Sequence, residues 1–309
     1  MSNISYLVAK KTGYANLFND LSEKLSASEL NTLLLEVFRT RAKKMRPAEL
    51  LRQFEKNRFA LPSEVEPIRF KEFEIRCLEI AKSKGFTPIT LSPLAPFGTC
   101  SAVAFVDQNN VVSALRGTEV VSDATNVFAL LMARELKKKK DHGLIKYTAT
   151  QRHVRSQGLS DPAFTAHFGI FCLATGGPDT GSFTFELEQL LDHINIHFAV
   201  YSNEFDLGKE RLLLKIFLKE ENETFHQRLK ESIKNIDNAV AIQIERQSDP
   251  GNYYKLVRFK FFLVRNEQEI NLSDGGFVDW TQQLIPNKKH RMLISGVGTE
   301  LIYKMKNLR

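Results

Sequence analysis

The spacing of apolar residues changes near Pro88, and this change most restricts the folds open to the chain. Before it, apolar side chains recur every three or four residues, as in 68–86 (IRFKEFEIRCLEIAKSKGF), a pattern typical of an amphipathic helix that Gly85 ends. After it, short β-rich apolar runs follow one another, separated by polar turns. Helices first and strands later predict an α+β fold, with a mostly antiparallel sheet flanked by helices.

The start of the chain is predicted to form a small helical region of its own. Ser26 and Glu29 make a capping-box pattern before a periodic apolar run, and a second helix is predicted at 48–59. Prolines at 62 and 67 then mark a boundary. Because 309 residues suffice for one large domain with an appendage, we predict a helical region at 1–66 and a core at 67–309.

Within the core, the pattern alternates between hairpins and helices. Two apolar runs separated by Gln108-Asn109-Asn110 predict a first hairpin, and a second pair of runs brackets a turn at 158–162. The expected strands are 101–107, 111–116, 144–156, 164–175, 211–218, 239–244 and 255–264, with helices at 126–136, at 183–201 and between the fifth and sixth strands. This order favours an antiparallel sheet with helices packed beside it.

Net charge and cysteine content restrict the compartment in which the protein is expected more than they restrict its function. The chain carries a net charge of +7 and a pI near 9.2, which favours an anionic partner such as a nucleotide, a nucleic acid or an acidic surface. Its three cysteines are far apart and lack zinc spacing, and no window is apolar enough for a membrane span. His193 and His197 share a helix face, but no HExxH-type acid completes a zinc site. We expect a cytoplasmic protein that does not enter membranes.

Four short motifs occur in order: 115–125 (LRGTEVVSDAT), 151–157 (QRHVRSQ), 275–280 (GGFVDW) and 296–301 (GVGTEL). In this order and at these separations they resemble the catalytic core of class II aminoacyl-tRNA synthetases, most nearly the histidyl type. The resemblance covers about residues 70–306. It implies an antiparallel sheet around an ATP or AMP site, and homodimerisation through the segment around 73–91.

The second motif supplies the candidate nucleotide site. The family pattern Phe-Arg-x-Glu is replaced by Val154-Arg155-Ser156-Gln157, so the resemblance assigns Arg155 to the α-phosphate and makes it the catalytic candidate. Gln157 keeps hydrogen-bonding capacity without the usual negative charge. After the loop, Phe168 would stack on adenine with His167 at its edge.

Two further segments supply the candidate substrate site. Arg116 fits the start of the family's amino-acid-binding segment, while Asp123 and Thr125 fit its end. The residues between are too many, so either an insertion separates the halves or Glu119 takes the acidic role of holding a ligand ammonium group. Asp123 and Thr125 can equally cap the following helix. In the third segment, Gly275 and Gly276 would let the backbone approach a ligand, with Asp279 retained.

The last motif shows a loss. Gly296 and Gly298 match the family pattern Gly-x-Gly-x-Asp/Glu-Arg, but Leu301 stands in the place of the arginine that lies against adenine and the γ-phosphate. This removes a positive charge from the triphosphate site. Mg²⁺ would accompany ATP, but the sequence assigns no acidic pair to hold it, and the metal ligands stay unassigned.

Three functions follow as hypotheses. The first is a class II synthetase-like paralogue that binds a nucleotide or an amino-acid-like ligand and does not charge tRNA. The second is an active ATP-dependent ligase that adenylates a carboxylate. The third is a tRNA- or nucleic-acid-binding module, which the basic charge permits although we see no anticodon-binding domain after the core. The loss at Leu301 favours the first hypothesis, and the retention of Arg155, His167 and Phe168 favours the second.

Overall fold

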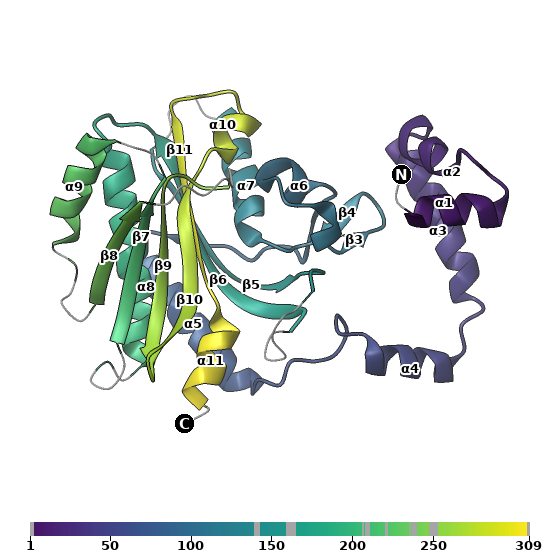
Figure 1. The fold of residues 1–309 in the computed structure, drawn as a ribbon, viewed down its shortest axis with the longest axis horizontal. Helices are drawn as coiled ribbons and strands as arrows, with labels where there is room; N and C mark the ends of the chain where they lie inside the picture. The colour runs from purple at the N-terminus through teal and green to yellow at the C-terminus, as the bar shows by residue number, and fades with distance from the viewer. Residues whose placement is uncertain are drawn as a thin grey trace.

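A computed structural model describes residues 3–138, 143–158, 165–205, 207, 211–219, 222–234, 236, 240–246 and 253–307. Their core is an eight-stranded sheet in which every described neighbouring pair is antiparallel except β1–β5 and β7–β8 (Figure 1). The spatial order is β1 (Thr87–Pro88), β5 (Ile145–Val154), β6 (His167–Pro178), β11 (His290–Val297), β10 (Gln268–Val278), β9 (Lys255–Arg265), β7 (Arg211–Leu218) and β8 (Val240–Arg246). The predicted α+β fold with a mostly antiparallel sheet is confirmed.

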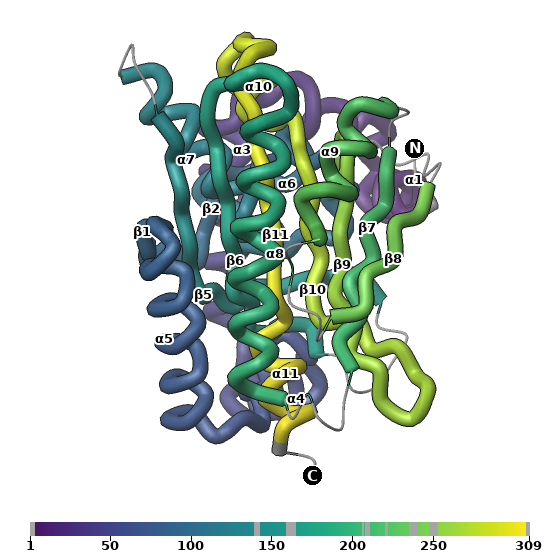
Figure 2. The backbone as a smooth tube through the Cα atoms, turned by 90° about the vertical axis from the view of Figure 1, so that its left-hand side faces the viewer, coloured from purple at the N-terminus to yellow at the C-terminus, as the bar shows by residue number. Residues whose placement is uncertain are grey.

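Helices pack against both faces of this sheet and give two hydrophobic clusters. Along one face lie α5 (Pro67–Ser83), α8 (Thr184–Glu204) and α9 (Glu223–Ile233), which Figure 2 shows side by side in front of the strands. Their apolar side chains join those of β6, β7, β9 and β11 in the larger cluster. On the other face, α6 (Thr99–Ala104), α7 (Ala124–Lys138) and α10 (Trp280–Leu284) bury the second cluster around Phe128 and Trp280. The terminal helix α11 (Thr299–Asn307) packs against α5 and β6.

The predicted first hairpin at 101–116 is wrong. Residues 99–104 form helix α6, and 108–110 form a 3-10 turn, η2 (Gln108–Asn110). Only β3 (Ser113–Ala114) remains of the second expected strand, in a small sheet with β2 (Leu94–Pro96) and β4 (Thr118–Val120). The Glu119 carboxylate explains the difference, because it accepts hydrogen bonds from the backbone N–H groups of Gly98 (2.8 Å) and Cys100 (2.9 Å) and so stabilises the start of α6.

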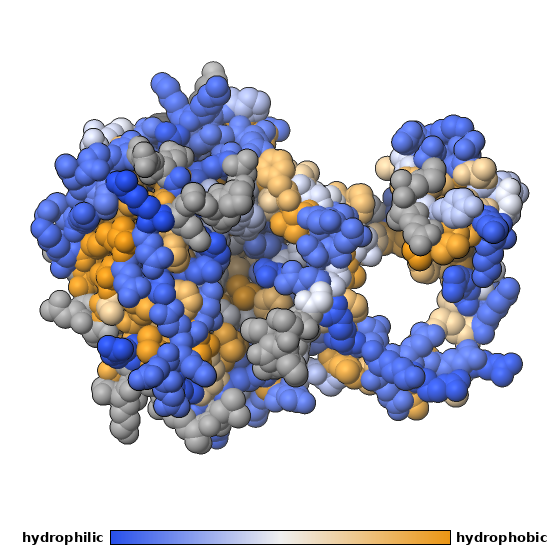
Figure 3. All heavy atoms as spheres, in the orientation of Figure 1, coloured by the Kyte–Doolittle hydropathy of each residue, from blue (hydrophilic) through white to orange (hydrophobic). Residues whose placement is uncertain are grey.

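The N-terminal helices lie apart from the core in Figure 1. They are α1 (Asn3–Thr12), α2 (Leu17–Asn19), the π-helical turn η1 (Asp20–Lys24), α3 (Ala27–Ala42) and α4 (Pro47–Lys56). The predicted capping box is confirmed, since Ser26 and Glu29 exchange side-chain-to-backbone hydrogen bonds. No side chain of α3 or α4 is buried among the described residues, and apolar side chains of this region stay exposed (Figure 3). Packing against the core therefore contributes little to these helices.

The cysteines, the hydropathy of the helices and the exposure of α5 bear on the expected environment and assembly of the protein. Cys77, Cys100 and Cys172 are unpaired and buried. Within the described ranges, no helix is both long and apolar enough to cross a bilayer. Helix α5 buries Phe73 and exposes Ile75, and homodimerisation through the segment around 73–91 stays a prediction.

Candidate functional site

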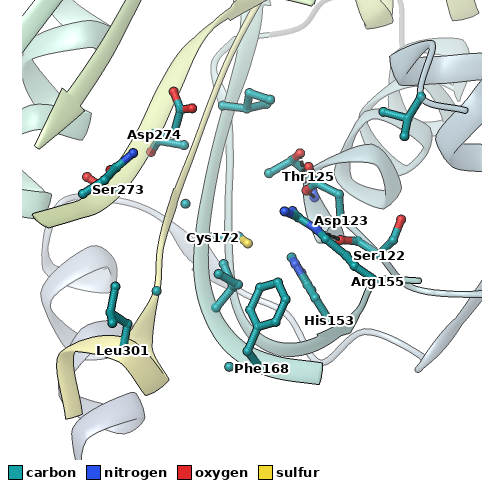
Figure 4. A pocket seen from close by; sticks show the side chains of 18 of the residues that line it. Ser122, Asp123, Thr125, His153, Arg155, Phe168, Cys172, Ser273, Asp274 and Leu301 are labelled. Carbon is teal, nitrogen blue, oxygen red and sulfur yellow. Dashed lines mark hydrogen bonds between the residues drawn. The ribbon is translucent and has the colours of Figure 1, made fainter. Parts of the chain in front are cut away.

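A cavity of about 700 Å³ opens on the face of the sheet that carries α7. The lining includes the start of α7, the end of β5, the start of β6, the start of β9, the middle of β10, the end of β11 and the turn into α11 (Figure 4). Segments more than a hundred residues apart thus share one site. Arg155, Phe168 and Gly298, which the sequence predicts around one cleft, all line it.

Arg155 and Phe168 contact each other where β5 ends and β6 begins. The Arg155 backbone N–H donates to Ala166 (2.8 Å), and its side-chain Nε donates to the carbonyl of Ser122 (3.2 Å). The guanidinium carbon lies 5.3 Å from the centre of the Phe168 ring, at cation–π distance. One face of the ring predicted to stack on adenine is therefore covered by the arginine itself.

The two candidate carboxylates have separate roles. Asp123 lines the cavity, where its Oδ1 accepts from the N–H (2.9 Å) and hydroxyl (2.7 Å) of Thr125 and its Oδ2 accepts from Tyr253 (3.2 Å). Glu119 does not line it, because this carboxylate is buried at the start of α6. Arg116 also lies elsewhere, with its backbone N–H bonded to Asn31 (2.9 Å). The structure thus brings the Asp123–Thr125 half of the motif to the cavity.

His167 points away from the cavity because neighbouring residues of a strand face opposite sides of the sheet. Its ring nitrogens contact Arg152 Nη1 (2.8 Å) and the carbonyl of Leu61 (2.6 Å). Phe168, one residue later, faces inward, as does Gln157 from the loop. The alternation along β6 therefore separates two residues that the sequence assigns to one nucleotide site.

At the turn into α11, the apolar side chain of Leu301 stands where the motif pattern has an arginine. Gly296, Gly298 and Leu301 line the cavity, and Leu301 also packs against the larger hydrophobic cluster. Lys304 reaches the same rim but pairs with Glu300 at 3.0 Å. Burial raises the pKa of Glu300, but hydrogen bonds from Ser63 and Lys304 and the charge of Arg152 outweigh it and lower this pKa overall. Lys304 is thus held by a carboxylate.

Gly275, Gly276 and Asp279 are absent from the cavity lining. A Cβ on Gly275 would lie 2.6 Å from both Phe259 and Ser295, and one on Gly276 would lie 2.6 Å from Tyr254. Both glycines therefore provide room for side chains of neighbouring strands. Asp279 sits at the start of α10 and pairs with Lys255 at 3.5 Å.

Sequence reasoning missed three polar groups of the cavity. Tyr253 hydrogen-bonds to Asp123, and Arg258 pairs with Asp274, its Nε lying 2.9 Å from Oδ1. Two consecutive tyrosines before a strand, with an arginine five residues on, were the only local signal. Arg258 and Asp274 lie on the paired strands β9 and β10, whereas Tyr253 and Asp123 meet from segments outside the strands.

The third missed group is His153 on β5, which lies directly opposite Phe168 on β6. Its side chain is 1% exposed, and its Nε2 accepts the backbone N–H of Ala124 (3.0 Å) at the start of α7. Burial lowers the pKa of His153 to about 4; the Asp123 carboxylate opposes this shift and the Arg155 charge adds to it. The imidazole is therefore neutral at pH 7.

Among the described residues, Arg155 is the cation of the cavity lining that has no carboxylate partner, because Arg258 and Lys304 are paired. The same described ranges contain no cluster of three or more His, Cys, Asp or Glu arranged to hold a metal ion. One unpaired guanidinium next to a hydrogen-bonded Asp123 suits a small ligand with an anionic group.

Comparison with known proteins identifies the fold. No protein-family model and no curated protein matches the chain. Among solved structures, it resembles an ATP phosphoribosyltransferase regulatory subunit/histidyl-tRNA synthetase from Bacillus halodurans C, with 14% identity, a TM-score of 0.60, and coverage of 81% of this chain and 82% of that one. The apo histidyl-tRNA synthetase of S. aureus follows at 11% identity and a TM-score of 0.58, over 80% of this chain and 70% of that one.

A third structure, described as the RNA binding domain of threonyl-tRNA synthetase from Cryptosporidium parvum Iowa II, is 12% identical with a TM-score of 0.57, over 79% of this chain and 67% of that one. At these identities the similarity concerns the fold. The core therefore has a class II aminoacyl-tRNA synthetase-like fold, with histidyl-type structures among its relatives in shape, as the order of the four motifs predicts.

Proposed function

We propose that this chain is a class II synthetase-like protein that binds a nucleotide- or amino-acid-like ligand in a degenerate site and does not charge tRNA. The observation that carries the proposal is Arg155, whose guanidinium has no carboxylate partner in the described part of the chain and lines a cavity that also holds Asp123. An anionic group of the ligand would meet Arg155. An ammonium group, where the ligand has one, would meet Asp123.

The charges around the cavity favour one phosphate over three. Leu301 occupies the position of the family's arginine, and the two other cations at the rim, Arg258 and Lys304, already have carboxylate partners. Extra phosphates would have to compete for them and would lack charge-assisted hydrogen bonds. We therefore expect AMP or an adenylate to bind better than ATP with Mg²⁺.

A thermal-shift panel of ATP with Mg²⁺, AMP, the amino acids and their sulfamoyl adenylates tests this proposal. Stabilisation by AMP or an adenylate analogue, without ATP turnover, would support it, because a ligand that binds only the folded state raises the melting temperature. Tighter binding of ATP with Mg²⁺ than of AMP would contradict the reading of Leu301. Pyrophosphate exchange with one carboxylate would instead establish the alternative, an ATP-dependent ligase.

Arg155→Ala is expected to weaken AMP binding by about 1.5–3 kcal/mol, the usual range for a hydrogen bond to a charged group. Calorimetry would measure the change. Arg134→Ala, an arginine exposed on α7, is the matched control and should leave the affinity unchanged. Leu301→Arg should raise the affinity for ATP more than for AMP. Equal affinities for AMP in Arg155→Ala and the unmodified protein would remove Arg155 from the site.

The location of the basic charge favours nucleic-acid binding as a second candidate function. Segment 39–58 (RTRAKKMRPAELLRQFEKNR) holds eight Lys or Arg and two Glu, against a net +7 for the whole chain. All of α4 is exposed, and hydrophilic side chains dominate this part of the surface in Figure 3. Such a segment can contact phosphates without a packed core beneath it.

Binding of tRNA as a function of salt tests this candidate. The triple variant Lys43→Ala, Lys44→Ala, Arg46→Ala should reduce the slope of log K against log [salt] by about 2–3, roughly one per lost phosphate contact. The control is the double variant Lys71→Ala, Lys84→Ala, which removes two surface lysines at helix α5 outside segment 39–58. An unchanged slope in the triple variant would exclude segment 39–58 as the contact.

A further inference from the structure

The proton of the buried His153 ring lies on the nitrogen that has no partner within the described ranges. Nε2 accepts the N–H of Ala124 at 3.0 Å, so this nitrogen carries the lone pair. A neutral imidazole has one proton, which must then reside on Nδ1. No described residue accepts from Nδ1, although the side chain is 1% exposed. A buried donor without an acceptor is costly, and native proteins rarely leave one without a reason.

The surroundings of this donor point to a ligand. His153 and Arg155 both line the cavity, and both contact Phe168. The His153 and Phe168 ring centres are 6.2 Å apart, and the guanidinium carbon of Arg155 lies 5.3 Å from the centre of the Phe168 ring. Figure 4 shows the two side chains extending into the same space. The nearby Asp123 accepts from Thr125 and Tyr253, and no hydrogen bond joins it to His153 Nδ1.

We infer that His153 is the second donor of an oxyanion site, in which its Nδ1–H and the Arg155 guanidinium meet one carboxylate or phosphate group of the ligand. The inference rests on the proposed function, because it concerns the same cavity. It adds that the anion is recognised by one charged and one neutral donor. His153 then has two roles: Nε2 holds the start of α7, and Nδ1, which neighbouring side chains cover in this structure, donates to the ligand once they move aside.

Two substitutions separate these roles. In His153→Gln the side-chain oxygen can reach the place of Nε2 and accept from Ala124, but the donor at Nδ1 is lost. In His153→Asn the amide N–H can replace Nδ1, but the contact with Ala124 is lost. We expect His153→Gln to keep its melting temperature and to bind the anion about ten- to a hundredfold more weakly. His153→Asn should melt lower and bind more tightly than His153→Gln.

Nitrogen-15 NMR of the imidazole, with AMP and inorganic phosphate as phosphate probes and glycine and acetate as carboxylate probes, completes the test. The ligand-free protein should show His153 neutral with its proton on Nδ1, and one class of probe should shift that resonance. A proton on Nε2 would overturn the inference before any ligand is added. If a probe binds but His153→Gln binds it equally well, only the inference fails. If no probe binds at millimolar concentration, both it and the proposed function fail.

Discussion

Lowering the pH from about 7.5 to about 5 is expected to reduce the free energy of unfolding by about 4–6 kcal/mol. Burial lowers the pKa of His153 to about 4 and that of His197 to about 3, from the usual value near 6.5. Burial also lowers the pKa of His193, and the charges of His197 and Lys146 add to this shift. In the unfolded chain these rings take up protons below pH 6.5, whereas in the folded protein they stay neutral. His153 and His197 each contribute a loss of about 2 kcal/mol at pH 5, and His193 adds a loss in the same direction.

The two histidines of α8, His193 and His197, are fully buried and bond to hydroxyl groups. His193 bonds to Thr175 (3.0 Å) and Ser295 (2.8 Å), while His197 bonds to Ser295 (3.0 Å) and Ser273 (3.1 Å). The serines and the threonine come from three neighbouring strands beneath α8. A proton added to either ring would place an unpaired charge in the main core. Stability should therefore be fully present above pH 6.5 and be lost as the pH falls toward 4.

Urea unfolding followed by the fluorescence of Trp280 across this pH range measures the effect. His197→Gln should lower the number of protons taken up on unfolding by about one near pH 5, since the slope of stability against pH counts those protons. His226→Gln on α9, at a partly exposed position, is the matched control. Stability that is independent of pH between about 7.5 and 5 would show that the three rings are not buried as described.

Gly275→Val is expected to destabilise the protein by about 3 kcal/mol, at the upper end of the usual range for overpacking a core. A Cβ at this position would already lie 2.6 Å from the Phe259 ring and from Ser295 Cβ. Gly275 is in β10, with β9 and β11 on either side, so the backbone has little room to move. The two extra methyl groups of valine would force the Phe259 ring out of its place in the main cluster.

Gly143→Val is the control for this substitution, because a Cβ there meets nothing within 4 Å. Its effect should stay within about 0.5 kcal/mol, as for most surface changes. Denaturant unfolding of both variants measures the difference, and AMP binding by the folded fraction of Gly275→Val should match the unmodified protein. A stable Gly275→Val variant with impaired binding would instead assign the glycine to the ligand, as the sequence motif suggests.

The sequence alone determined what depends on near neighbours. Local hydrogen bonds form the capping box at Ser26 and Glu29. Apolar periods of 3.6 and 2 residues predict helix α5 and the strand pair β5–β6. The order of the four motifs also predicted the class II synthetase-like fold. Arg155, Phe168 and Gly298 share one cavity because that fold brings the ends of their strands together.

Only the tertiary structure decided which polar groups line the cavity and which stabilise helices around it. Residues 101–104 are apolar enough for a strand, but the carboxylate of Glu119, fifteen or more residues away, stabilises a helix there. Asp123 and Glu119 look equivalent in sequence, and their roles separate because α6 buries one of them. His153 gained its role from the N–H of Ala124, which belongs to another element. Such partners are set by the packing of distant segments, and the local pattern of residues carries no information about them.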